Sequence, residues 1–169
     1  MTFLELFRAE FDEEMKKTRR MLESIPDTDF NWKPHEKSMS AGQLAYHLAL
    51  VPGRIIGFVQ HNPAEGPGAG LPQPANRQEI LDAFDKSIAT VRNVLPTFDD
   101  AAMNEIWRLL VNGQEIVAQP RGEFLRDIMF SHWYQHRGQF SVYLRLLNIP
   151  VPASWGPSAD EVPSARQKA

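Results

Sequence analysis

Residues 131–139 read Ser-His-Trp-Tyr-Gln-His-Arg-Gly-Gln, and this string decides how the rest of the chain is interpreted. His132 and His136 are four residues apart, so on a helix they lie on one face, one turn above the other. Two imidazoles at this spacing can bind one metal ion, as in the helical H-E-x-x-H zinc sites. The Glu of that motif is missing here, so the pair indicates a metal without indicating a metalloprotease.

The two histidines continue an apolar stripe along a helix predicted from Pro120 to about Asn148. The stripe consists of Leu125, Ile128, Met129, Phe140, Tyr143 and Leu147. His132, His136 and Gln139 fill the missing places of that stripe. The pattern therefore predicts imidazoles that point into the core.

A second helix, predicted over Gly42–Gln60, carries a third histidine in its apolar stripe. Leu44, Leu48, Val51, Ile55 and Phe58 form this stripe, and His47 lies within it. If the two helices are neighbours, His47, His132 and His136 converge on one point. The alternative is three packed core histidines, but each buried nitrogen without a partner costs about 1–3 kcal/mol. Because one metal satisfies a nitrogen of every ring, we predict that these three residues are metal ligands.

The remaining pattern predicts an all-α protein. Two more amphipathic helices are expected over Thr2–Glu23 and Asn76–Val94, the first with a Thr2–Glu5 capping box. Asn112-Gly113 between two β-rich runs, 106–111 and 114–118, indicates a type I′ hairpin. The prediction is a four-helix bundle with a small β-hairpin between the third and fourth helices, in which metal sites come from facing helices.

Length and composition fit one domain, predicted over residues 1–157, followed by a flexible tail over 158–169. The net charge is -3 and no Lys/Arg cluster resembles a nucleic-acid footprint, so no nucleic-acid partner is expected. The chain has no cysteine, which excludes a thiolate-ligated zinc site and a protein thiol nucleophile. No secretory signal or stretch of about 18 apolar residues is apparent, so we expect a cytoplasmic protein without membrane association.

Several motifs together resemble the DinB/YfiT-like superfamily of four-helix metalloproteins. They are Asn-Trp-Lys-Pro at 31–34, Ser-Ala-Gly-Gln-Leu-Ala-Tyr-His-Leu at 40–48 and His-Trp-Tyr-Gln-His-Arg-Gly-Gln at 132–139. Residues 143–145 and 150–157 are similar to the closing segment of that family, so the resemblance covers residues 1–157. It implies a metal held by one histidine of the second helix and two of the fourth, here His47, His132 and His136. It also implies a homodimer, and relatives of known reaction are thiol-dependent S-transferases and a mycothiol-dependent isomerase.

Three neutral imidazoles leave coordination positions open, as in catalytic rather than structural sites. An all-nitrogen ligand set suits Zn²⁺ or Ni²⁺ best. Such a metal can lower the pKa of a bound water to about 7, or hold a low-molecular-weight thiol as its thiolate. Because the protein has no cysteine, the sulfur would arrive with a cosubstrate.

Five further residues are weaker candidates for the site. Gln139 could orient an imidazole or donate to a ligand, and Tyr46 and Tyr134 could line the pocket or act as acids. Arg54 could bind an anionic group of the substrate, and Trp32 could cover the pocket mouth. The alternatives are a hydrogen bond at the core edge for Gln139, packing for both tyrosines, a surface ion pair for Arg54 and a loop-to-bundle contact for Trp32.

Three charged residues are not expected to take part in the chemistry of the site. Arg137 should face away from the metal and pair with an acid or a carbonyl, while Glu10 and Glu14 are predicted at the flank of the first helix. No carboxylate thus stands out as a general base. The first functional hypothesis is a metal-dependent enzyme on a small molecule, most simply a thiol-dependent S-transferase. Its alternatives are a metal-dependent hydrolase and a non-catalytic metal-binding, stress-response or sensing protein.

Overall fold

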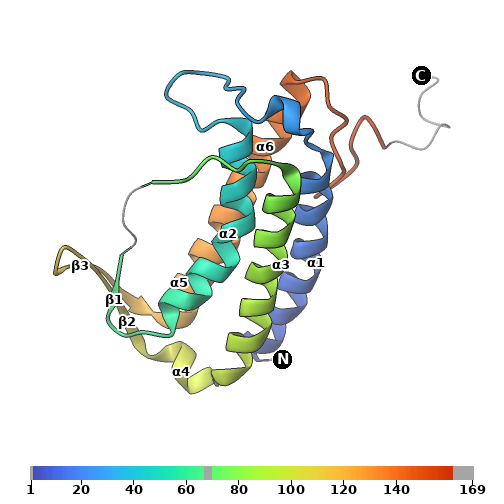
Figure 1. Cartoon of the computed structure of the whole chain (residues 1–169). Coiled ribbons are helices and arrows are strands. Elements are labelled where there is room, and N and C mark those ends of the chain that lie inside the picture. Colours follow the sequence, from blue (N-terminus) through green and yellow to red (C-terminus); the bar gives the residue numbers. More distant parts are fainter. Residues whose placement is uncertain (1, 67–69, 162–169) are drawn as a thin grey trace.

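The structure is a computed structural model that describes residues 2–66 and 70–161, and these residues are mostly helical (Figure 1). The helices, in chain order, are α1 (Phe3–Ser24), α2 (Ala41–Val59), α3 (Arg77–Val94), α4 (Asp100–Asn104), α5 (Arg121–Arg126) and α6 (His132–Leu146). A π-helical turn, η3 (Asp127–Ser131), joins α5 to α6. The segments in which the sequence showed apolar stripes therefore form long helices, and these helices run side by side.

Side chains at the predicted start residues cap the long helices. Thr2 and Glu5 form the expected capping box at α1, and Ser40 forms one with Gln43 at α2. The side chain of Asn76 accepts a hydrogen bond from the backbone of α3. Each cap satisfies backbone N–H groups that the first helical turn leaves without a partner. The predicted boundaries of these helices are consequently right to within one residue.

A small sheet is built on a hairpin that lies between α4 and α5 in the chain. Strands β2 (Ile106–Val111) and β3 (Gln114–Pro120) pair antiparallel, and Asn112 and Gly113 have φ of 52° and 74°, which confirms the type I′ hairpin. A third strand, β1 (Ala64–Glu65), pairs parallel with β2. The sequence predicted only the two-stranded hairpin, so the sheet has one strand more than expected. The two residues of β1 form a strand because the backbone of β2 provides hydrogen-bond partners for them.

The last helical segment turns a different face to the core from the one that the sequence predicted. In η3 the N–H of His132 donates to the carbonyl of Asp127, five residues back rather than four. One extra residue per turn rotates everything that follows by about 100°. The buried residues of α6 are accordingly Trp133, Arg137, Phe140 and Leu144. His132 and His136 lie beside this stripe and are half-buried, so the prediction that they point into the core is wrong.

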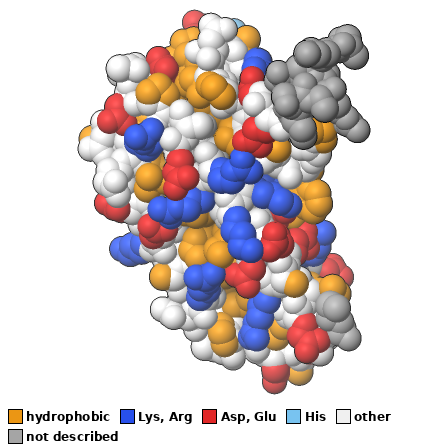
Figure 2. Space-filling model, turned by 90° about the vertical axis from the view of Figure 1, so that its right-hand side faces the viewer, with side chains coloured by type: hydrophobic (Ala, Val, Ile, Leu, Met, Phe, Trp, Pro, Cys, Tyr) orange, Lys and Arg blue, Asp and Glu red, His pale blue; other side chains and the backbone are white. Residues whose placement is uncertain are grey.

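The core lies between α1, α2, α3 and α6, and Trp133 is at its centre. Its ring stacks on Phe11 of α1 at a centroid distance of 5.9 Å and packs against Phe84 of α3 at 6.3 Å. The outer side of α1 and α3 carries interspersed acidic and basic side chains (Figure 2). Arg92 pairs with Asp12 there, at 3.3 Å, across the two helices.

The C-terminal segment contacts this body beyond the predicted domain end. Asp160 forms an ion pair with Arg145 at 2.6 Å, and Glu161 contacts Arg20. Of the predicted tail, residues 162–169 lie outside the described residues. Among the described helices, none combines the length and the apolar character that a bilayer crossing requires.

Candidate metal centre

Helices α2 and α6 bring the three predicted ligands together. Each of His47, His132 and His136 offers one ring nitrogen within 4.8 Å of the other two. The ring centroids are 5.2 Å apart for His47 and His132, 4.6 Å for His47 and His136, and 4.4 Å for His132 and His136. The convergence expected from two separate sequence patterns is thus present.

The spacing of the nitrogens fits a shared metal ion. The Nε2 atoms of His47 and His132 are 2.9 Å apart. Two nitrogens that each lie about 2.0–2.1 Å from one metal are separated by about 2.9 Å in octahedral and about 3.3 Å in tetrahedral coordination. The same distance also suits a single proton shared between two neutral rings. A ligand set of three imidazoles and no carboxylate matches the nitrogen-preferring divalent metals.

Gln139 fixes the orientation of one ring. Its Oε1 lies 2.8 Å from Nδ1 of His136. An amide oxygen only accepts, so Nδ1 must carry the proton and Nε2 keeps its lone pair free for a metal. Gln139 therefore makes the contact expected of a residue that orients a ligand.

The surroundings of His47 and His132 favour the neutral form of these two imidazoles. Burial, together with the neighbouring rings of His136 and His132 and the charge of Arg54, lowers the pKa of His47 to about 4. Burial and the proximity of His136 also lower the pKa of His132. Because a metal competes with protons for these nitrogens, a lowered pKa favours metal binding at neutral pH.

Arg54 and Tyr46 both line a groove of about 460 Å³ between α2 and α3. Arg54 is exposed, and its charge contributes to the lowered pKa of His47. Lys86 lines the same groove from α3. Arg54, a predicted substrate contact, and Tyr46, a predicted pocket residue, therefore lie along one groove.

Trp32 lies in the segment before α2 and packs edge-on against Tyr143 at a centroid distance of 5.4 Å. The hydroxyl of Tyr143 in turn donates to the carbonyl of Met39, 3.3 Å away. These contacts join the loop before α2 to α6. They favour the loop-to-bundle alternative for Trp32.

Tyr134 is on the opposite side of α6 from the two histidines. Its hydroxyl donates to the carboxylate of Glu10 on α1, and burial followed by this hydrogen bond raises the pKa of Tyr134. The structure therefore does not bring Tyr134 together with the three imidazoles.

Arg137 is a scaffold residue, as the sequence predicted. Its guanidinium is 3% exposed, pairs with the carboxylate of Glu14 and donates to Thr18 Oγ1 at 3.2 Å. Glu14 is only 1% exposed, so its predicted place at the flank of α1 is wrong. Glu14 points inward because it pairs with the buried guanidinium of Arg137. This partner lies on α6, so the sequence of α1 alone does not indicate it. The ion pair fixes α6 against α1.

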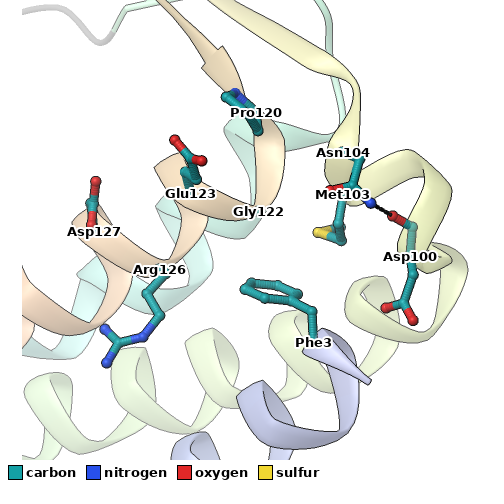
Figure 3. Close-up of a pocket in the computed structure, with 9 residues that line it drawn as sticks. All are labelled: Phe3, Asp100, Met103, Asn104, Pro120, Gly122, Glu123, Arg126 and Asp127. Carbon is teal, nitrogen blue, oxygen red and sulfur yellow. Dashed lines mark hydrogen bonds between the residues drawn. The ribbon is translucent and has the colours of Figure 1, made fainter. Parts of the chain in front are cut away.

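A cavity of about 580 Å³ lies away from the histidines, where the start of α1 meets α4 and α5 (Figure 3). Its wall includes Phe3, Met103, Glu123, Arg126 and Asp127. This cavity could not be predicted from the sequence, because its residues come from segments far apart in the chain and share no motif. None of the three histidines lines it.

Comparison with known proteins agrees with this fold. A model of the DinB superfamily matches residues 10–140. An uncharacterized protein of Bacillus subtilis strain 168, YrdA, is 26% identical over 162 residues, covering 94% of this chain and 91% of YrdA.

Solved structures are similar over most of the chain. A DinB-like protein from Bacillus cereus ATCC 10987 superimposes with a TM-score of 0.72 at 21% identity, over 88% of this chain and 95% of that one. A structure described as a putative member of the DinB family, from Exiguobacterium sibiricum 255-15, gives a TM-score of 0.65 at 18% identity, over 91% and 97% of the two chains. With most of its length matched by the family model, the chain belongs to the DinB superfamily.

Proposed function

We propose that this protein is a metal-dependent enzyme that acts on a small molecule, with His47, His132 and His136 as the metal ligands. The observation that carries the proposal is the convergence of three half-buried imidazoles from α2 and α6, two of them with Nε2 atoms 2.9 Å apart. In this proposal, α5, η3 and α6 act as one broken helix, the fourth member of a bundle with α1, α2 and α3.

When bound, a Zn²⁺ or Ni²⁺ ion would supply Lewis acidity at an open coordination position, either to acidify a water or to hold a thiol as its thiolate. Three contributions of the protein's own residues would favour binding of this ion and of an anionic substrate. Gln139 keeps the proton of His136 on Nδ1. Burial keeps His47 unprotonated at neutral pH. Arg54, exposed beside His47, offers a charge to an anionic group of the substrate.

Thiol-dependent S-transfer is favoured over hydrolysis by resemblance to relatives with that reaction. Fold alone does not fix a reaction, so this step stands on analogy. The chain has no cysteine, so a thiol would have to come from a low-molecular-weight cosubstrate. We further propose one domain over residues 1–157, a homodimer, and a cytoplasmic location in keeping with a cysteine-free chain.

A thiol titration of the Co²⁺-substituted protein tests the reaction class. Binding of a thiolate to Co²⁺ adds a sulfur-to-metal charge-transfer band, so we expect a new near-ultraviolet absorption with at least one cellular thiol. His47→Ala should abolish the band. The exposed His61→Ala, outside the cluster, should retain it.

A metal that only joins the helices is the competing possibility. In that case, Co²⁺ would bind and raise the stability of the protein, but none of a panel of thiols would change its spectrum. That result would count against S-transfer and leave the metal site in place.

A further inference from the structure

Helix α2 continues through a proline, Pro52, which lies five residues after His47. Proline has no N–H, so the carbonyl of Leu48, four residues earlier, loses its partner within the helix. The indole Nε1 of Trp133 on α6 donates to this carbonyl at 2.9 Å. A hydrogen bond between two helices thus replaces one within α2.

This bond joins the residues next to two of the proposed ligands. Leu48 follows His47 on α2, and Trp133 follows His132 on α6. The indole-to-carbonyl contact and the Nε2–Nε2 contact of the two histidines, each 2.9 Å, therefore connect the same turns of the same helices.

The indole has little freedom to move. Trp133 is 1% exposed and lies between the rings of Phe11 and Phe84, which come from α1 and α3. Its direction is set by the close-packed core and not by the histidines. The hydrogen bond from the fixed indole of Trp133 to Leu48 can therefore hold α2 in place relative to α6.

A second polar contact near the proline serves a different pair of helices. The N–H of Gly53 donates to Ser87 Oγ on α3 at 2.7 Å, and Ser87 Oγ donates to the carbonyl of Leu50 at 3.3 Å. A Cβ at Gly53 would come within 2.6 Å of Ser87 Oγ, so only glycine permits this approach. The contact joins α2 to α3 without involving α6, which makes Ser87 a matched control.

We propose that Trp133 is a positioning residue for the metal centre: its hydrogen bond to the carbonyl freed by Pro52 sets the distance between His47 and His132. This inference rests on the proposed function, because it assigns the bond a role in metal binding beyond satisfying a buried carbonyl.

Pro52→Ala separates these two roles. The new N–H at position 52 can bond to Leu48 within α2, so the carbonyl is satisfied even when the indole is absent. The double variant Trp133→Phe/Pro52→Ala then has a satisfied carbonyl but lacks the link between α2 and α6, and it shares with Trp133→Phe the loss of indole volume from the core. Three variants are needed: Trp133→Phe, this double variant and Ser87→Ala. Zn²⁺ affinity would be measured by chelator competition, and stability by denaturant unfolding of the metal-free protein.

We expect Trp133→Phe to lower both the stability and the Zn²⁺ affinity, the latter by about 10-fold, as is usual for residues that orient ligands. In the double variant, stability should recover relative to Trp133→Phe while the affinity stays about 10-fold reduced. Ser87→Ala should lower stability and leave the affinity at the wild-type value. Wild-type affinity in the double variant would overturn the proposal, and the double variant decides the matter if Trp133→Phe alone does not fold.

A metal-free readout keeps this test separate from the proposed function. Nuclear Overhauser contacts between the imidazole protons of His47 and His132 should be strong in the wild type and lost in the double variant. If the wild-type protein bound no Zn²⁺, the proposed function would fail. Contacts that persist in the double variant would overturn the positioning role itself.

Discussion

Burial ties the protonation of His47 to folding. Its pKa is about 4 in the folded protein, against 6.5 ordinarily. Between these values the unfolded chain binds more protons than the folded one, so this contribution to stability is complete above about pH 6.5 and is lost as the pH falls towards 4. We expect the melting temperature of the metal-free wild type to fall through this window more steeply than that of His47→Gln. Parallel pH profiles for the two proteins would contradict this assignment.

Gly138 lies between the proposed ligand His136 and its hydrogen-bond partner Gln139, but the space beside it is open. A close approach by another helix would explain a glycine in mid-helix, yet a Cβ at Gly138 would meet nothing within 4 Å. Glycine costs a helix interior about 1 kcal/mol relative to alanine. Gly138→Ala should therefore raise the free energy of unfolding by about 1 kcal/mol in denaturant titrations. A loss of stability would mean that another molecule or a second subunit packs on this position.

At the scale of the element, the connection from α5 to α6 explains why the three histidines converge as predicted although their burial differs from the prediction. His132 and His136 both follow the π turn, so their four-residue spacing on α6 is regular and the three rings converge as predicted. The apolar residues before the turn gave the wrong phase for the helix after it, because a π turn leaves no signature in hydrophobic spacing. Trp133 and Arg137 are buried instead of the two histidines.

The packing of α6 against α1 depends on a buried ion pair. Arg137 and Glu14 are 3% and 1% exposed, so removal of Arg137 leaves the buried carboxylate of Glu14 with only the part-buried Lys17, 2.7 Å away, as a charged partner. We expect Arg137→Met to cost about 3–5 kcal/mol in denaturant unfolding. Adding Glu14→Leu to Arg137→Met should recover most of this loss, because the buried carboxylate is then gone.

The exposed pair Arg92–Asp12 provides the comparison for that experiment. Arg92→Met should change the free energy of unfolding by no more than about 1 kcal/mol, the usual size for a surface pair. If Arg137→Met were as mild, the guanidinium would not be buried against Glu14 as the structure has it.

At the scale of the whole molecule, contacts that are local in sequence were predictable and contacts set by tertiary neighbours were not. Capping residues and Asn112-Gly113 act within a few residues, so helix starts and the hairpin follow from the sequence. Strand β1 exists only because β2 lies beside it. The cavity beside Phe3 and the inward turn of Glu14 likewise depend on segments far apart in the chain.

The central claim is that one divalent metal binds to His47, His132 and His136, and elemental analysis of untagged protein tests it most directly. Zn²⁺ or Ni²⁺ should be retained at about one equivalent by the wild type, and by His35→Ala and His61→Ala, whose exposed side chains lie outside the cluster. His132→Ala should lose it. If the wild type holds no metal, and takes up none when Zn²⁺ or Ni²⁺ is added, then the three imidazoles only pack and hydrogen-bond between α2 and α6, and the account is wrong.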